Sequence, residues 1–181
     1  MAVDLSGLKV AIIATDMVEE VELVEPRQAL EDAGVTTELL SPRGGQIISA
    51  KHFDKSKKYK VDALLGSAEP AAYDALLIPG GALNADFIRI DPQAQKFVQK
   101  FDEGGKPMAV ICHGPWLLVS AGVAEGRTLT SFHTIADDIR NAGAEWVDRS
   151  VVIDENIITS RKPDDIPAFN RAALELFATA K

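Results

Sequence analysis

Short apolar runs alternate along the chain with segments whose apolar residues recur at helical spacing. Continuous runs at residues 8–14, 73–79 and 108–111 are typical of strands buried on both faces of a parallel sheet. After Pro92, apolar residues stand at positions i, i+3, i+4 and i+7, which predicts an amphipathic helix. Strands that alternate with helices predict an α/β fold with a doubly wound, mostly parallel sheet sandwiched by helices. Ligands bind at the carboxyl ends of the strands in such a fold.

The remaining segments continue this alternation less regularly. In chain order, the pattern predicts a helix ending near residue 33, a strand at 35–40, a turn into a short strand at 43–48, a strand at 127–131, a helix at 134–142, a hairpin at 151–159 and a last helix after Pro163. Residues 51–60 are basic and polar, with five lysines, and we expect a solvated loop there.

Composition narrows the class of protein. The 181 residues are 46% hydrophobic and 25% charged, which predicts one globular domain over residues 1–181. The single cysteine excludes an internal disulfide and fits a reducing compartment. A net charge of −8 gives no electrostatic basis for binding nucleic acid or an anionic membrane. Residues 1–6 lack the features of a signal peptide, and no apolar run could span a bilayer, so we predict a cytoplasmic protein.

That single cysteine stands where the sequence changes from strand to helix. Cys112 follows the apolar run 108–111, and Gly114-Pro115 opens a segment with helical spacing that Gly122 closes. A thiol at such a turn resembles the nucleophile of an elbow and faces helix N-terminal amides, which favour a thiolate and a low thiol pKa. A lone cysteine is more often a small buried apolar residue, and only this context favours a nucleophile.

Two further motifs should reach the same edge of the sheet. Gly80-Gly81 follows the run 73–79 and can expose consecutive backbone N–H groups, as an oxyanion hole requires, although a glycine pair alone is more often a simple turn. The acids Glu19, Glu20 and Glu22 follow the first strand. For Glu20, as for Glu25, the simplest interpretation is that acids in a first helical turn complement the helix dipole.

Several stretches, in order and spacing, resemble the ThiJ/PfpI family, relatives of the class I glutamine amidotransferases. They are AVICHGP at 109–115 followed by SAGV at 120–123, EEVEL at 19–23, IPGG at 78–81, DDIRNAG at 137–143 and VVID at 151–154. The similarity runs from about residue 9 to residue 177. It is greatest to the PfpI branch, in which histidine directly follows the cysteine. A flavodoxin-like fold is what this resemblance implies.

The resemblance also implies roles for individual residues. Cys112 would be the nucleophile and His113 its base, with Glu22 as a buried acid in contact with the sulfur. Glu19 would be a second acid near the pocket. The backbone at Gly80-Gly81, through the Gly81 N–H, would hold the oxyanion together with the N–H of His113.

Three positions near His113 are also assigned by resemblance. In the PfpI branch an acid from the neighbouring subunit orients the histidine, and Asp86 is the candidate here, with Asn84 as its rival. Phe132 matches the family position nearest the cysteine. His133 is therefore expected to be a surface residue.

The function implied is a cysteine-dependent stress-response enzyme acting on reactive carbonyls such as glyoxal or methylglyoxal, or on early glycation adducts. Peptidase activity is a lower-ranked alternative, and the expected assembly is a homodimer or higher homo-oligomer. Neither zinc-type ligand spacing nor a phosphate or dinucleotide motif is present, so we expect no metal and no cofactor. A second hypothesis is a redox sensor or chaperone in which Glu22 stabilises an oxidised Cys112. A third is a small-molecule binding domain without chemistry.

Overall fold

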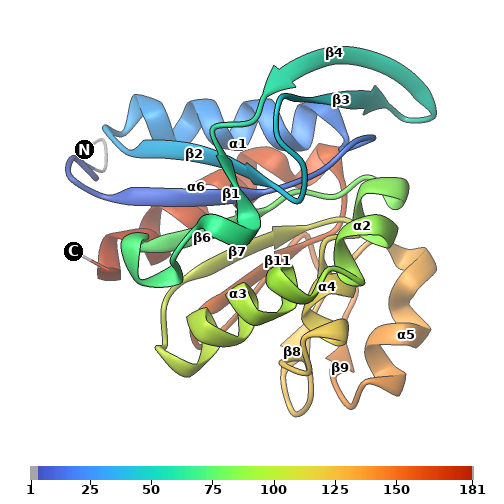
Figure 1. The fold of residues 1–181 in the computed structure, drawn as a ribbon. Coiled ribbons are helices and arrows are strands. Elements are labelled where there is room, and N and C mark those ends of the chain that lie inside the picture. The colour runs from blue at the N-terminus through green and yellow to red at the C-terminus, as the bar shows by residue number, and fades with distance from the viewer. Residues whose placement is uncertain (1–3, 181) are drawn as a thin grey trace.

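A seven-stranded sheet forms the centre of the protein in a computed structural model, which describes residues 4–180 (Figure 1). In spatial order its strands are β10 (Val151–Asp154), β11 (Ile157–Ser160), β7 (Met108–Ile111), β6 (Ala75–Ile78), β1 (Lys9–Ile13), β2 (Thr36–Ser41) and β5 (Ala63–Leu64). Neighbouring strands are parallel except for the β10–β11 hairpin. Residues 1–3, part of the amino terminus considered above, lie outside the described residues, as does residue 181.

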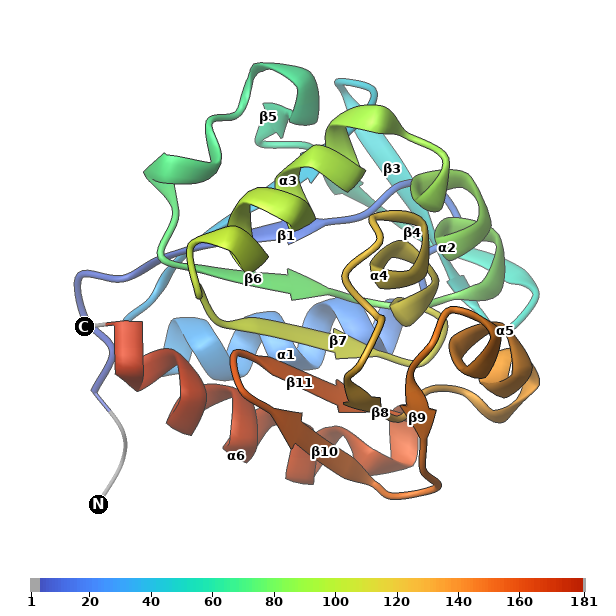
Figure 2. The same cartoon turned by 90° about the horizontal axis from the view of Figure 1, so that it is seen from below.

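Helices cover both faces of this sheet, as the sequence predicts. The two helices on one face are α1 (Glu20–Asp32) and α6 (Ile166–Phe177), and those on the opposite side are α2 (Ala82–Arg89), α3 (Pro92–Glu103), α4 (Pro115–Ser120) and α5 (Ala136–Asn141) (Figure 2). Short 3₁₀ helices span Leu65–Ser67, Pro70–Ala72, His133–Ile135, Pro163–Asp165 and Ala178–Ala180. The doubly wound, mostly parallel α/β sandwich is confirmed.

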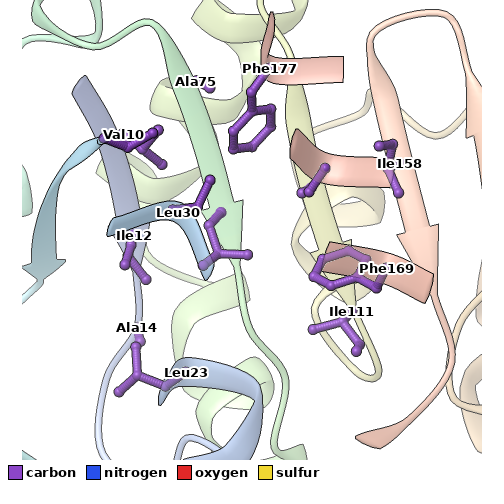
Figure 3. Packing of buried hydrophobic residues seen from close by; sticks show 14 of the residues in the cluster. Val10, Ile12, Ala14, Leu23, Leu30, Ala75, Ile111, Ile158, Phe169 and Phe177 are labelled. Carbon is purple, nitrogen blue, oxygen red and sulfur yellow. The ribbon is translucent and has the colours of Figure 1, made fainter. Parts of the chain in front are cut away.

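Alternation along each strand divides the core into two layers. Val10 and Ile12 of β1 point toward α1 and α6, whereas Ala11 and Ile13 join the layer under α3 and α4. Figure 3 shows the first layer, in which Phe169 and other side chains of α6 and α1 pack over the sheet. Because both faces are covered, the central strands β6 and β7 are apolar throughout rather than alternating with polar residues.

The prediction of a solvated loop at residues 51–60 is wrong. Residues Asp54–Lys60 form strand β4, which pairs antiparallel with β3 (Gln46–Lys51) in a hairpin outside the main sheet. Most side chains of β4 are exposed, so its residues show no apolar alternation. Backbone pairing with β3 holds this strand, and hydropathy does not report such pairing.

The carboxyl ends of β1, β6 and β7 meet at one edge of the sheet. The chain leaves β1 toward β2 on one side, whereas β6 lies on its other side, so the boundary between β1 and β6 is a topological switch point. Gly80-Gly81 follows β6 and Cys112 follows β7 at this edge. Among residues 4–180, no helix combines the length and the apolar character needed to cross a bilayer.

Candidate active site

Cys112 occupies a strained turn between β7 and α4. Its φ of 64° lies in the left-handed region, which residues other than glycine seldom adopt. Two residues later, a Cβ added to Gly114 would lie 2.9 Å from the carbonyl oxygens of Ile78 and Ile111. The turn therefore requires glycine at 114 and presents the thiol at the strand end, as in a nucleophile elbow.

The paired glycines bring backbone N–H groups to the sulfur. The N–H groups of Gly81 and His113 donate hydrogen bonds to Cys112. A Cβ on Gly80 would lie 2.6 Å from the Cβ of Cys112 and 2.6 Å from Oε2 of Glu22, so no larger residue fits beside the thiol. Two converging N–H donors can stabilise negative charge on the sulfur or on an oxygen bound to the carbon it attacks.

Glu22 is the buried acid of the site. It extends from the first turn of α1, is 0% exposed, and accepts a hydrogen bond from the N–H of Gly80 at 2.9 Å. Burial raises the pKa of Glu22 from 4.5 to about 8, although hydrogen bonds with Cys112 and Gly80 oppose the rise. At neutral pH the carboxyl is therefore mostly protonated and can donate a hydrogen bond to a negatively charged partner.

The pKa of the Cys112 thiol is raised, whereas the sequence predicts a low pKa. Burial and the neighbouring Glu22 raise the pKa of Cys112, and the hydrogen bonds from Gly81 and His113 lower it by less. Only 6% of the residue is exposed, and α4 is a single short helix of 6 residues, so desolvation outweighs the helix amides. The resting thiol keeps its proton and needs a base.

His113 lies where such a base is required. Its Nδ1 is 3.2 Å from Sγ of Cys112. Burial, together with the charge of the nearby His133, lowers the pKa of His113 to about 4, so the imidazole is neutral at physiological pH. A neutral ring nitrogen in contact with a protonated thiol can accept its proton.

Three side chains hold the imidazole, and the sequence pointed to only one of them. The predicted residue Phe132 stacks on the His113 ring with centroids 4.9 Å apart. Trp116 meets the ring edge-on at 5.5 Å, and Oγ1 of Thr134 lies 3.3 Å from Nε2. Trp116 stands three residues after His113 in the first turn of α4, a spacing that could have identified it. Thr134 follows an irregular connection, and no sequence pattern marks it. His133 is exposed, as expected.

The other acids of the 19–22 cluster face the β3–β4 hairpin. Glu19, predicted near the pocket, accepts a hydrogen bond from the His52 N–H at 3.0 Å, and its charge contributes to the raised pKa of Glu22. Glu20, for which the sequence indicates only a helix-dipole role, is buried and accepts hydrogen bonds from the Ser49 hydroxyl and the Lys57 N–H. These hydrogen bonds, together with one from Ser56, lower the pKa of Glu20 to about 2. Glu20 thus attaches the hairpin to α1.

Asp86 and Asn84 have different surroundings within α2. Asn84 is buried, where it accepts the Thr15 N–H at 2.7 Å and donates to the Gly80 carbonyl at 2.9 Å. It therefore supports the glycine turn and does not approach His113. Asp86 is exposed on the outer side of the helix. Its assignment to a neighbouring subunit stays a prediction.

The cavities near the site are small. One of about 220 Å³ lies beside Phe132 and His133 and is also lined by Arg161 and Lys162. A larger cavity of about 460 Å³ lies between residues 65–71 and α3 and includes none of the predicted site residues. Within the described part of the chain, no group of three or more His, Cys, Asp or Glu residues could hold a metal ion.

The raised pKa of Glu22 predicts that its replacement by glutamine stabilises the protein. A group whose pKa is raised by folding contributes most to stability below its unfolded pKa, near 4.5, and loses that contribution as pH rises toward the folded value of about 8. At pH 7 the wild-type protein has lost about 3 kcal/mol in this way. We expect Glu22→Gln to raise the free energy of unfolding at pH 8 by about 2 kcal/mol, and by much less at pH 5.

Urea unfolding at both pH values measures this difference. Glu25→Gln is the matched control because Glu25 is exposed on the same helix, and its effect should be small at both pH values. A Glu22→Gln variant that is equally destabilised at pH 5 and pH 8 would contradict a protonated Glu22.

Comparisons with known proteins agree with this geometry. The family model described as "DJ-1/PfpI family" matches residues 8–176. The chain is 38% identical over 168 residues to the "Putative cysteine protease YraA" of Bacillus subtilis, covering 93% of this chain and 97% of that protein. It is 41% identical over 169 residues to the "Protein/nucleic acid deglycase 2" of Escherichia coli, covering 93% of this chain and 96% of the relative.

A solved structure gives the same result for the fold. The two-domain protein of Anabaena variabilis, which contains dj-1/thij/pfpi-like and ferritin-like domains, superposes with a TM-score of 0.87 at 35% identity. The match covers 94% of this chain but 50% of that longer protein. On its sequence, its fold and its cysteine turn, the chain belongs to the DJ-1/PfpI family.

Proposed function

We propose that this protein is a cysteine-dependent enzyme that acts on small reactive carbonyl compounds or on the early glycation adducts that they form. The observation that carries this proposal is the set of groups in contact with the sulfur of Cys112. Sγ of Cys112 lies 3.2 Å from Nδ1 of His113 and accepts hydrogen bonds from the N–H groups of Gly81 and His113. A nucleophile, its base and two oxyanion donors thus meet at the end of β7.

The first chemical step is addition of the thiol to an aldehyde carbon. The proton of Sγ passes to Nδ1 of His113 while the S–C bond forms and the carbonyl π electrons move to oxygen. The Gly81 and His113 N–H groups stabilise that oxygen, which then takes the proton back from Nδ1 to give a hemithioacetal. Glu22, protonated, donates a hydrogen bond toward the sulfur and limits charge build-up in the buried site.

For a 2-oxoaldehyde, the hemithioacetal can rearrange to a product acid. His113 removes the proton on the sulfur-bound carbon, and a proton is returned to the adjacent carbon. The hydroxyl proton of the hemithioacetal passes to the former ketone oxygen, which gives a thioester of a 2-hydroxy acid. Water then cleaves the S–C bond and restores the thiol. Overall, one 2-oxoaldehyde and one water yield one 2-hydroxy acid, with one carbon oxidised and its neighbour reduced.

The size of the opening favours a small substrate. Cys112 is 6% exposed, so an electrophile of few atoms reaches the sulfur more easily than an extended peptide. The relatives include one named as a putative cysteine protease and one named as a deglycase. We therefore place aldehydes and glycation adducts ahead of peptides, and we expect the active form to be a homodimer or larger homo-oligomer.

Steady-state kinetics with methylglyoxal test this function. Wild-type protein should consume it catalytically, and His113→Ala should lower kcat/KM by about 100-fold because the base is lost. The matched control is His52→Asn, a change at an exposed hairpin histidine with φ of 58°, a conformation that asparagine tolerates. Equal activity of wild type and His113→Ala would argue against base catalysis by His113. No turnover of methylglyoxal by the wild-type protein would contradict the proposed function.

One observation also favours a second function, redox sensing or chaperone activity through Cys112. Glu22, protonated and in contact with the thiol, could donate a hydrogen bond to a sulfinate oxygen. A sensor of this kind needs Cys112 and Glu22 but not His113. Mass measurement after mild peroxide treatment of the His113→Ala variant separates it from the enzyme, because a sensor should still gain two oxygen atoms at Cys112.

A further inference from the structure

We propose that Thr134 is a positioning residue that fixes which nitrogen of His113 carries the proton, so that Nδ1 keeps a free lone pair toward Cys112. This inference rests on the proposed function and assigns a role to a residue on the connection before α5. Oγ1 of Thr134 lies 3.3 Å from Nε2 of His113, on the opposite side of the ring from the 3.2 Å contact between Nδ1 and Sγ.

The neutral imidazole determines how these two contacts are made. A neutral ring has one N–H donor and one acceptor nitrogen. In the proposed resting site the single S–H of Cys112 donates to Nδ1, which lies 3.2 Å from Sγ. Nδ1 is then the acceptor, and Nε2 carries the proton. Nε2–H then donates to Oγ1 of Thr134, because a hydroxyl oxygen can accept this bond.

The ring cannot easily turn to make other contacts. Phe132 stacks on it with an interplanar angle of 25°, and Trp116 stands against it at 63°. Trp116 is itself held by a 2.8 Å hydrogen bond to Asp138 and by the guanidinium of Arg89, 5.0 Å above its ring. Because these contacts fix the ring plane, only the choice of which ring nitrogen carries the proton can still vary. The contact with Thr134 favours protonation at Nε2.

Thr134 also supports the charged state that follows proton transfer. When Sγ gives its proton to Nδ1, the imidazole becomes a cation with two N–H groups. One faces the thiolate and the other donates to Oγ1. The charged and titratable groups around the ring are Cys112 and Glu22 on the sulfur side and His133 beside Phe132, with Asp138 and Arg89 behind Trp116.

Alkylation of the only cysteine gives a readout that does not depend on turnover. The rate at which iodoacetamide modifies Cys112, followed by mass from pH 5 to pH 9, reports how readily the thiol loses its proton. We expect Thr134→Val to lower this rate at pH 7 about tenfold, as for one lost hydrogen bond. The pH profile should move upward by about one unit. Thr134→Ser should restore both.

Controls and a second measurement make the inference falsifiable. Thr36→Val is the same chemical change at an exposed position of β2 and should leave alkylation unchanged. Long-range ¹H–¹⁵N NMR of the wild-type protein should show His113 protonated at Nε2. Protonation at Nδ1, or an unchanged alkylation profile in folded Thr134→Val, would overturn the proposal.

The same experiment separates Thr134 from Asp86 and from the proposed function. If a neighbouring subunit's Asp86 alone orients His113, Asp86→Ala should slow alkylation and Thr134→Val should not, which contradicts our inference. If the alkylation profile shifts as expected in Thr134→Val but wild type never consumes methylglyoxal, the positioning role stands and the proposed substrate is wrong. In an active enzyme, Thr134→Val should lower kcat more than it changes KM.

Discussion

Replacing Cys112 by serine is expected to lower kcat/KM for methylglyoxal by at least about 1000-fold. A serine hydroxyl ionises far less readily than a thiol, and His113, whose pKa is lowered to about 4, is too weak a base to compensate. The substitution keeps the Cβ and the left-handed backbone at φ 64°, so the free energy of unfolding should change little. Steady-state kinetics and urea unfolding of the same preparation measure both quantities.

Cys112→Ala provides the background for this comparison. The two variants should have the same residual rate, because neither side chain offers a usable nucleophile. A serine variant that keeps more than a tenth of the wild-type kcat/KM would mean that the sulfur is not the attacking atom.

Gly81→Ala should both destabilise the protein and remove most of its activity. Gly81 has φ of 87°, and an added Cβ would lie 2.5 Å from the Met17 carbonyl oxygen and 2.6 Å from the Glu19 nitrogen. With ψ of 120°, Gly81 lies outside the left-handed helical region, and alanine there suffers backbone strain of about 1–3 kcal/mol. It also suffers a steric conflict of about 1–3 kcal/mol with backbone that cannot easily move. Relief of that conflict would shift the Gly81 N–H, to which we assign the oxyanion in the proposed function, so we expect kcat/KM to fall about 100-fold.

Gly45→Ala separates the two causes. Gly45 has nearly the same φ, 88°, but an added Cβ would meet nothing within 4 Å. Its urea unfolding should show only the backbone strain, and its kcat/KM should stay close to wild type. If Gly81→Ala and Gly45→Ala lowered the free energy of unfolding equally, the predicted steric conflict between residue 81 and residues 17–19 would be absent.

Sequence patterns predict most reliably the features that depend on burial or on an unusual backbone conformation. The apolar strands and the glycines around Cys112 are constrained by close packing, and these constraints restrict residue type strongly. Strand β4 is not predicted because backbone pairing with β3 and polar contacts with Glu20 hold it, and its exposed side chains leave no periodic signal. The thiol pKa was misjudged because exposure of the sulfur depends on packing from α1 and the β6 turn, segments remote in sequence.

Contacts across connections were also beyond sequence reasoning. Thr134 reaches His113 over 21 residues, and nothing in an irregular segment fixes such a distance in advance. Trp116, by contrast, lies on the same helical turn as His113 and could have been inferred from spacing.

Glu20 and Glu22 lie in the same helical turn, yet their carboxyl groups have very different pKa values. Residues two apart on a helix project on opposite sides of its axis. The pKa of Glu20 is about 2 and that of Glu22 is about 8. Near neutral pH, Glu20 is therefore ionised and Glu22 is mostly protonated. Acidification to pH 5 would thus leave the attachment of the β3–β4 hairpin intact, whereas mild alkali would remove the proton of Glu22 beside Cys112.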